Sequence, residues 1–238
     1  MAFNVNYSFN NGAKTGTATS ITALRQAIYS YGLDTLNQCT LSGTAEGDLT
    51  TGNSIGTSTG NSRGIFQDCS NLVSLDLSSF DTSNVTSMKG MLQSCSSLTS
   101  LDLSNLDTSN VNTMYYMFSD CSSLTSLGLS NFNTSNVTSV SRMFSGCSNL
   151  EHIYIGENWS VSQVSDSYYM FTDCIKLPNF NSSYIDKTKA YYGDGGYLEY
   201  KGPPIPTVPL IKLGSTSISA IKLGDTEISK IYLGEIQL

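Results

Sequence analysis

The stretch from Ile65 to Leu177 repeats with a period of about 26 residues, and this repetition constrains the fold more than any other feature of the chain. The phrase Cys-Ser-x-Leu-x-Ser-Leu-x-Leu-Ser begins at Cys69, Cys95 and Cys121 and recurs in degraded form at Cys147. A fixed period of roughly 20 to 50 residues indicates a row of similar units, none of which can bury its apolar face alone. The units are therefore predicted to stack as a solenoid, which offers a long regular surface and usually no catalytic cleft.

Each unit is expected to contain a short strand followed by a short helix. In the second unit, Leu101 and Leu103 are spaced as the inward side chains of a strand. After Leu106, an Asp-Thr-Ser-Asn cluster of helix N-cap residues predicts a short helix that begins near Ser109. Its apolar stripe would consist of Val111, Met114, Met117 and Phe118.

The same positions recur in register, so their apolar side chains are expected to form columns along the stack. At about 25 cal/mol per Å² of apolar surface removed from water, these columns would supply most of the stabilisation. The columns are Leu75/Leu101/Leu127/Ile153, Leu77/Leu103/Leu129/Ile155, Phe80/Leu106/Phe132/Trp159 and Phe66/Leu92/Phe118/Phe144/Phe171.

These units resemble the BspA-type leucine-rich repeats of bacterial surface proteins, whose pattern is Leu-x-x-Leu-Asp-Leu-Ser-x-Phe-Asp-Thr-Ser-x-Val-x-x-Met-x-x-Met-Phe-x-x-Cys. Residues Leu72 to Cys95 reproduce that pattern with Leu92 in place of the final Phe, and three further units follow with growing drift. The resemblance implies an α/β fold, a leucine-rich-repeat solenoid over residues 64–180. It also implies an association with adhesion to host or matrix surfaces, and it brings no catalytic residue.

The segments on either side are predicted to cap the stack. Residues 1–63 are expected to hold an edge strand at Asn4 to Phe9, a helix over Ser20 to Tyr31, and a Gly/Ser/Thr-rich stretch from residue 42 that is either a long loop or a degenerate rung. Residues 181–209 are expected to form a second cap, with a hairpin over Ala190 to Tyr200 and then a proline-rich linker.

Residues 210–238 carry a second repeat, with a period of ten, in which Ile-Lys-Leu-Gly or Ile-Tyr-Leu-Gly begins each unit. Each unit is predicted to be two short strands around a Gly-led turn. A segment this short cannot bury enough surface to stand alone, so we expect it to associate with copies of itself, with the solenoid or with another protein. The expected assembly residues are Ile211, Leu213, Ile221, Leu223, Ile231 and Leu233. The tail is similar to the Ile-Tyr-Leu-Gly decapeptides at the ends of some tailed-bacteriophage structural proteins.

The composition and the pattern of apolar residues argue against nucleic-acid binding, a membrane span and a secretory signal. Only 13% of residues are charged and the net charge is −7, which argues against nucleic acid. No apolar run reaches the roughly 18 residues of a membrane span, and the first residues lack the basic and apolar regions of a secretory signal.

Together with the phage-like decapeptides of the tail, these features predict a bacteriophage virion surface protein, namely a trimeric head fibre, tail fibre or capsid decoration. It would contact other virion proteins through its tail and a host-surface protein or glycan through its repeats. The alternative is a bacterial cell-surface adhesin of the BspA type without its signal and anchor.

Enzymatic activity is not expected. The single histidine, His152, occupies the strand position that Ser74 and Ser100 hold in other units, and we interpret it as a solvent-facing variant of that serine. Asp76 and Asp102 would form a stacked carboxylate pair, and paired carboxylates about 5–10 Å apart can hydrolyse glycosides. Because the pattern predicts no cleft that would desolvate one of them, a hydrated surface row is the preferred interpretation.

The cysteines at the repeated position are predicted to be reduced core residues rather than disulfides, because parallel side chains on successive coils do not aim at one another. Their spacing and the lone histidine do not suit a zinc site, and no cofactor is expected.

Two sets of polar positions are candidates for ligand binding. The outward strand column presents polar side chains at regular intervals, which suits hydroxyl-rich ligands such as glycans. The pair of residues that precedes each Met-Phe or Met-Leu varies from unit to unit, and tyrosines at these positions either form a recognition surface or pack against neighbouring turns. The candidate residues are Asp76, Asp102, His152 and Tyr154 in the strand column and Tyr115, Tyr116, Tyr168 and Tyr169 in the variable pairs.

Overall fold

The computed structural model describes residues 4–51, 63–192, 195–201, 221–223 and 226–228. The chain divides into two compact units, Met1–Gly202 and Pro203–Leu238. The fold is mixed α/β and consists mostly of strands, and α1 (Ile21–Tyr31) is the one α-helix among the described residues. No helix in those residues is long and apolar enough to cross a membrane. The finer division of the chain at residues 63, 180 and 209 stays a prediction.

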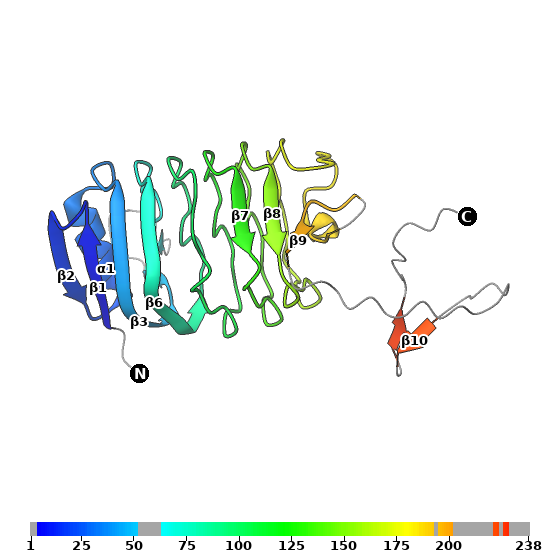
Figure 1. The fold of residues 1–238 in the computed structure, drawn as a ribbon, viewed down its shortest axis with the longest axis horizontal. Coiled ribbons are helices and arrows are strands. Elements are labelled where there is room, and N and C mark those ends of the chain that lie inside the picture. Colours follow the sequence, from blue (N-terminus) through cyan, green and yellow to red (C-terminus); the bar gives the residue numbers. More distant parts are fainter. Residues whose placement is uncertain (1–3, 52–62, 193–194, 202–220, 224–225, 229–238) are drawn as a thin grey trace. The chain divides into compact units, whose positions relative to one another are not determined.

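A four-stranded sheet begins the first unit, in the order β2-β1-β3-β6 (Figure 1). Its first two pairings, β2 with β1 and β1 with β3, are antiparallel, and β3 with β6 is parallel. The predicted strand β1 is confirmed, but it lies inside the sheet, because β2, for which no strand was predicted, forms the edge. The strands are β1 (Asn4–Phe9), β2 (Lys14–Ala18), β3 (Gln38–Asp48) and β6 (Ser74–Ser87).

The predicted helix of this first part is also confirmed. The side chain of Ser20 caps α1 by accepting a hydrogen bond from the backbone N–H of Ala23 at 3.1 Å. Leu24 and Ile28 of α1 are fully buried in the core. The Gly/Ser/Thr-rich stretch starts as a strand, since β3 pairs with β6 as far as Asp48 and β4 (Thr50–Thr51) pairs with β5 (Arg63–Gly64). Residues 52–62 lie outside the described residues.

After β6, successive coils of the chain run side by side and hydrogen-bond in parallel (Figure 1). Parallel bridges connect Ser87 to Thr113, Thr113 to Ser139 and Ser139 to Asp166, so the register between coils follows the sequence repeat. Further along, β7 (Ser126–Leu129) pairs in parallel with β8 (His152–Ile155). The predicted registration of the repeats is confirmed at these positions.

The short helix expected near Ser109 is wrong, because residues 115–120 form consecutive turns. The N–H groups of Tyr116 and Phe118 donate to carbonyls of the next coil, at 3.1 Å to Ser141 and 2.9 Å to Met143. An α-helix would need these same N–H groups for carbonyls four residues earlier in its own chain. Tyr116 and Asp120 also have positive φ, which breaks a right-handed helix. Within the described part of each coil, bonding to the neighbouring coil replaces helix formation.

The core is built from the predicted columns. Phe118 and Phe144 stack with ring centroids 5.8 Å apart and an interplanar angle of 1°, and Phe144 and Phe171 stack at 5.6 Å. All three rings are fully buried. In the first leucine column, Leu127 and Ile153 are fully buried, whereas Leu101 is only partly buried.

The hairpin expected over Ala190 to Tyr200 is wrong. The second arm, β9 (Glu199–Tyr200), pairs in parallel with β8 and not with the first arm. Tyr192 meets Leu198 in a single parallel bridge, and η1 (Lys187–Lys189) precedes this segment. The main-chain bonding available on β8 therefore outcompetes a local turn, and β9 ends the three-stranded sheet β7-β8-β9.

In the second unit, β10 (Ile221–Leu223) pairs antiparallel with β11 (Thr226–Ile228), with Ile221 opposite Ile228. This confirms the predicted pair of short strands for the middle decapeptide. The assembly residues Ile211, Leu213, Ile231 and Leu233 lie outside the described residues.

Two glycines give a matched test of this coil packing. At Gly156, a Cβ atom would overlap the carbonyl oxygen of Ser130 in the preceding coil, whereas at Gly128 it would meet open space. We expect Gly156→Ala to lower the free energy of unfolding by about 1 kcal/mol or more, because the coils would have to separate. The control Gly128→Ala should leave stability unchanged or raise it by up to about 1 kcal/mol. Equal effects in urea unfolding would contradict the close approach of these coils.

Candidate functional site

The strand column presents two ionised carboxylates at its N-terminal end. Asp76 accepts a hydrogen bond from the backbone N–H of Ser78 at 2.9 Å, and Asp102 accepts one from that of Ser104 at 2.9 Å. The backbone N–H and then the hydroxyl of Ser78 lower the pKa of Asp76, and the hydroxyl and then the N–H of Ser104 lower the pKa of Asp102. Both carboxylates are exposed hydrogen-bond acceptors.

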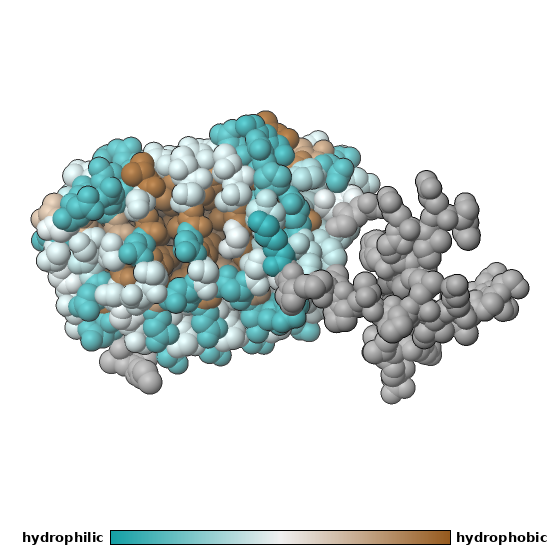
Figure 2. All heavy atoms as spheres, viewed as in Figure 1, coloured by the Kyte–Doolittle hydropathy of each residue, from teal (hydrophilic) through white to brown (hydrophobic). Residues whose placement is uncertain are grey.

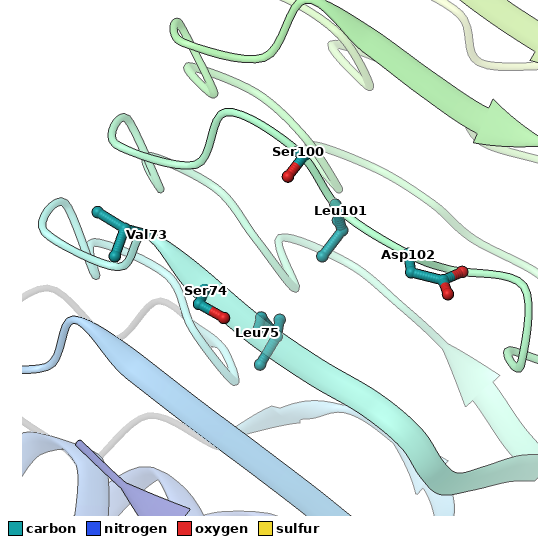
Figure 3. Close-up of a pocket in the computed structure, with 6 residues that line it drawn as sticks. All are labelled: Val73, Ser74, Leu75, Ser100, Leu101 and Asp102. Carbon is teal, nitrogen blue, oxygen red and sulfur yellow. The ribbon is translucent and has the colours of Figure 1, made fainter. Parts of the chain in front are cut away.

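A shallow hollow of about 340 Å³ lies beside these carboxylates, between β6 and the following coil. Figure 3 shows one stretch of chain from each coil facing this hollow. Leu75 and Leu101 contribute apolar surface, and Val73 is 49% exposed at the rim. In Figure 2, apolar residues form a patch over β6 and the neighbouring coils, with hydrophilic residues scattered among them. The hollow is lined by Val73, Ser74, Leu75, Ser100, Leu101 and Asp102.

The hollow exists because two neighbouring coils are not joined there. Backbone bonding connects Ser97 to Ser70 at 3.1 Å, and the side-chain amide of Asn105 reaches the carbonyl of Phe80 at 3.2 Å. Between these two points, residues 99–102 make no backbone hydrogen bond to any residue that the structure describes. The backbone N–H and C=O groups of this stretch are therefore available to a ligand.

The other end of the strand column makes intramolecular contacts. His152 Nδ1 lies 2.5 Å from Glu199 Oε1, and the His152 ring stacks on Tyr154 with centroids 5.7 Å apart. Lys201 Nζ lies 3.5 Å from the centre of the Tyr154 ring. The expectation of a solvent-facing His152 is wrong in part, because this side chain is half-buried and bonded to β9. His152 and Tyr154 fasten β9 to β8.

The variable pairs form a separate group on the turns. Tyr115 and Tyr116 are partly buried and contact each other edge to face, with centroids 4.3 Å apart. Burial, and then the hydroxyl of Tyr116, raise the pKa of Tyr115 to about 12, so this phenol stays neutral. Tyr168 and Tyr169 are 72% and 50% exposed. The packing interpretation is confirmed for Tyr115 and Tyr116, which contact each other and are partly buried. Tyr168 and Tyr169 are exposed, and a recognition role for the tyrosines stays a prediction.

The predicted site residues thus fall into three groups: the two carboxylates, His152 with Tyr154, and the tyrosines of the variable pairs. Sequence reasoning missed the hollow and the two cations, Lys89 and Arg142, whose side chains contact the tyrosines. A signal for the cations was present, because Arg142 stands in register with Tyr116 and Tyr169. The hollow had no such signal, since Leu101 has the same spacing as every other leucine of its column.

The five cysteines at the repeated position are buried free thiols, as predicted, and Cys39, for which no prediction was made, is also buried and free. From Cys95 onward, the thiol of each repeat cysteine donates a hydrogen bond to a carbonyl of the preceding coil. The bonds run from Cys95 to Phe66 (3.2 Å), Cys121 to Leu92 (3.1 Å), Cys147 to Phe118 (3.0 Å) and Cys174 to Phe144 (3.0 Å). Among the residues described, no group of three His, Cys, Asp or Glu side chains could hold a metal ion.

Comparison with known protein families gives a match. The family described as "Mycoplasma protein of unknown function, DUF285" matches residues 61–186, which is more than half of the 238-residue chain. No curated protein and no solved structure matches the chain. The match covers the coils that carry the hollow and the variable tyrosines.

The buried thiols predict a loss of stability in alkali. Burial raises the pKa of Cys69 to about 11 and the pKa of Cys121 to about 12, from an ordinary value of 9.0. Above pH 9 the unfolded chain releases thiol protons that the folded chain keeps, so the free energy of unfolding should fall as pH rises, by about 1–2 kcal/mol per thiol at pH 10.

Urea unfolding with reductant between pH 7 and pH 10 measures this slope. Cys121→Ala should be less stable at pH 7 but show a shallower decline. A flat profile, or rapid reaction of the native thiols with a disulfide reagent at pH 8, would contradict the buried ladder of thiols.

Proposed function

The chain belongs to the DUF285 family, which is related to BspA-like repeat proteins, and from this premise we propose that it is a non-enzymatic protein that recognises a glycan-bearing surface. In this proposal, the repeats of residues 64–180 form a leucine-rich-repeat solenoid of the BspA kind. Support comes from the parallel register between coils, which follows the sequence repeat, and from the buried columns of leucine and phenylalanine. A regular stack of this kind offers surface for binding and no enclosed reaction chamber.

The observation that carries the proposal is the hollow between β6 and the next coil. Leu75 and Leu101 can receive the C–H face of a sugar ring, which is apolar. The carboxylate of Asp102 and the hydroxyls of Ser74 and Ser100 can bond to sugar hydroxyls. The free main-chain groups of residues 99–102 add donors and acceptors. Its volume is at the lower end of the range for small-ligand sites, roughly 300–1,000 Å³, so the ligand would be one or two sugar rings of a larger glycan.

The proposed location of the protein is the surface of a bacteriophage virion. Support comes from the resemblance of the C-terminal decapeptides to those of phage structural proteins and from the strand pair β10-β11 in the second unit. In this arrangement the tail attaches to other virion proteins and forms a trimer, and the repeats contact the host. Membership of a family related to BspA-like proteins favours the second candidate, an adhesin on a bacterial cell surface.

Filling the hollow tests the binding site. Val73→Arg places a long side chain over the hollow from an exposed rim position, so we expect at least a tenfold loss of binding on a glycan array. Thr125→Arg makes the same change at the equivalent exposed position two coils further on and should bind as the wild type does. Equal binding by both variants would exclude the hollow, and release of new reducing ends from bound glycans would show an enzyme instead.

Mass measurement in solution tests the assembly. The full chain is expected to be a trimer, and deletion of residues 205–238 should give a monomer, because the proposed contacts are made by the apolar side chains of the decapeptides. As a matched change in the full chain, Ile211→Lys, Ile221→Lys and Ile231→Lys together should also give a monomer. A monomeric full chain would contradict the virion proposal and leave the adhesin as the better candidate.

A further inference from the structure

A chain of alternating cations and tyrosines crosses four neighbouring coils on the turn side of the stack. Lys89 Nζ lies 5.5 Å from the centre of the Tyr115 ring, which contacts Tyr116 edge to face. Arg142 Cζ lies 5.5 Å from the Tyr116 ring and 4.9 Å from the Tyr169 ring. We call Lys89, Tyr115, Tyr116, Arg142 and Tyr169 the turn ladder. We propose that the turn ladder is a second binding surface, separate from the hollow, and that it binds sugars that carry an acidic group.

Arg142 is the centre of this surface. Its guanidinium lies over one tyrosine ring from the coil before it and one from the coil after it. Among the residues that the structure describes, no carboxylate lies within ion-pair distance of Arg142 and no acceptor takes a hydrogen bond from its guanidinium. The edge of a guanidinium carries paired N–H groups that match a carboxylate or a sulfate. The guanidinium N–H groups of Arg142 can therefore bind a carboxylate or a sulfate from a ligand.

The turn ladder carries two cations, and one carboxylate, that of Asp166, lies near it. Asp166 is an acidic residue near the ladder, and its charge acts on the pKa of Tyr115 in the direction opposite to that of Arg142. Its Oδ2 accepts a hydrogen bond from the hydroxyl of Ser139 at 2.9 Å, and its Oδ1 has no hydrogen-bond partner among the described residues. Lys89 adds a second positive charge at the other end of the ladder. In a chain with a net charge of −7, these two cations lie together among tyrosines.

The backbone at these positions indicates that the side chains are not there for folding alone. Gly90, Tyr116, Arg142 and Tyr169 occupy the same place in successive coils, with φ of 59°, 60°, 55° and 59°. Glycine adopts this left-handed conformation without strain, as it does in the first of these coils, whereas a bulky residue costs free energy. The other left-handed position of each coil carries small or short polar residues, namely Asp68, Ser94, Asp120, Gly146 and Asp173.

The three bulky residues thus hold a backbone conformation that glycine adopts without strain. Strained backbone conformations cluster at functional sites. Tyr169 is half exposed and Tyr168 beside it is more so, which leaves flat aromatic surface for the apolar face of a sugar ring. A sugar stacked there would place an acidic substituent near Arg142, and this combination selects acidic sugars over neutral ones.

Binding of chemically modified dextrans to the full chain tests this inference. Dextran, dextran sulfate and carboxymethyl dextran of matched length share one sugar backbone and differ only in their acidic groups. We expect at least one of the two acidic forms to bind at least tenfold more tightly than neutral dextran. Preference for the sulfate or for the carboxylate identifies the acid and supports the proposal either way. Equal binding of all three polymers, or no binding of the acidic forms, would overturn it.

Substitutions by glycine separate binding from folding. Arg142→Gly and Tyr169→Gly relieve backbone strain, so the thermal unfolding temperature should stay the same or rise while binding of the acidic dextran falls at least tenfold. Arg142→Lys keeps the charge but loses the paired N–H groups, and an intermediate loss is expected. Ser94→Gly makes the same backbone change at the other left-handed position and should not alter binding.

Two further measurements distinguish binding at the turn ladder from binding at the hollow. Asp102→Asn, which changes the hollow, should leave the binding of acidic dextran unaltered. The test of the turn ladder is therefore independent of the test of the proposed function. If Arg142→Gly and Tyr169→Gly bind the acidic dextran as the wild type does, the turn ladder is not the site and the inference is wrong.

Discussion

Main-chain hydrogen bonding between neighbouring coils is the interaction on which the rest of this structure depends. The N–H groups of Met88, Met114 and Val140 each donate to a carbonyl of the following coil at 2.9–3.0 Å. These bonds hold each coil in register with the next, and that register brings equivalent side chains together in columns. The stacked phenylalanines and the thiol ladder are consequences of this alignment, and so is the row of cations and tyrosines on the turns.

The repeat made much of this arrangement predictable from the sequence. Because identical spacing places identical residues at identical points of each coil, the apolar columns and the buried cysteines could be assigned before any coordinates. Ser20 indicated the start of its helix through local chemistry, since a serine hydroxyl caps free N–H groups wherever a helix begins. Both kinds of signal are carried by the residues themselves.

The remaining features depend on contacts between residues far apart in sequence. Met114, Met117 and Phe118 have a spacing that suits a helix, and it equally suits consecutive turns with bonds to the residue three positions earlier, such as Met117 to Met114 at 3.1 Å. The neighbouring coil decides between the two. The hollow at Leu101 arises where coils fail to pair, and the bond from His152 to Glu199 joins residues that lie 47 positions apart. Sequence spacing within one repeat carries no information on any of these contacts.

The thiol bonds between coils have a consequence for the chemistry of the cysteines. Each sulfur from Cys95 to Cys174 donates a hydrogen bond to a main-chain carbonyl of the preceding coil and is shielded from solvent. Aligned sulfurs on a bare surface would cross-link in air. Burial therefore limits the access of oxidants to this row of cysteines in the folded chain.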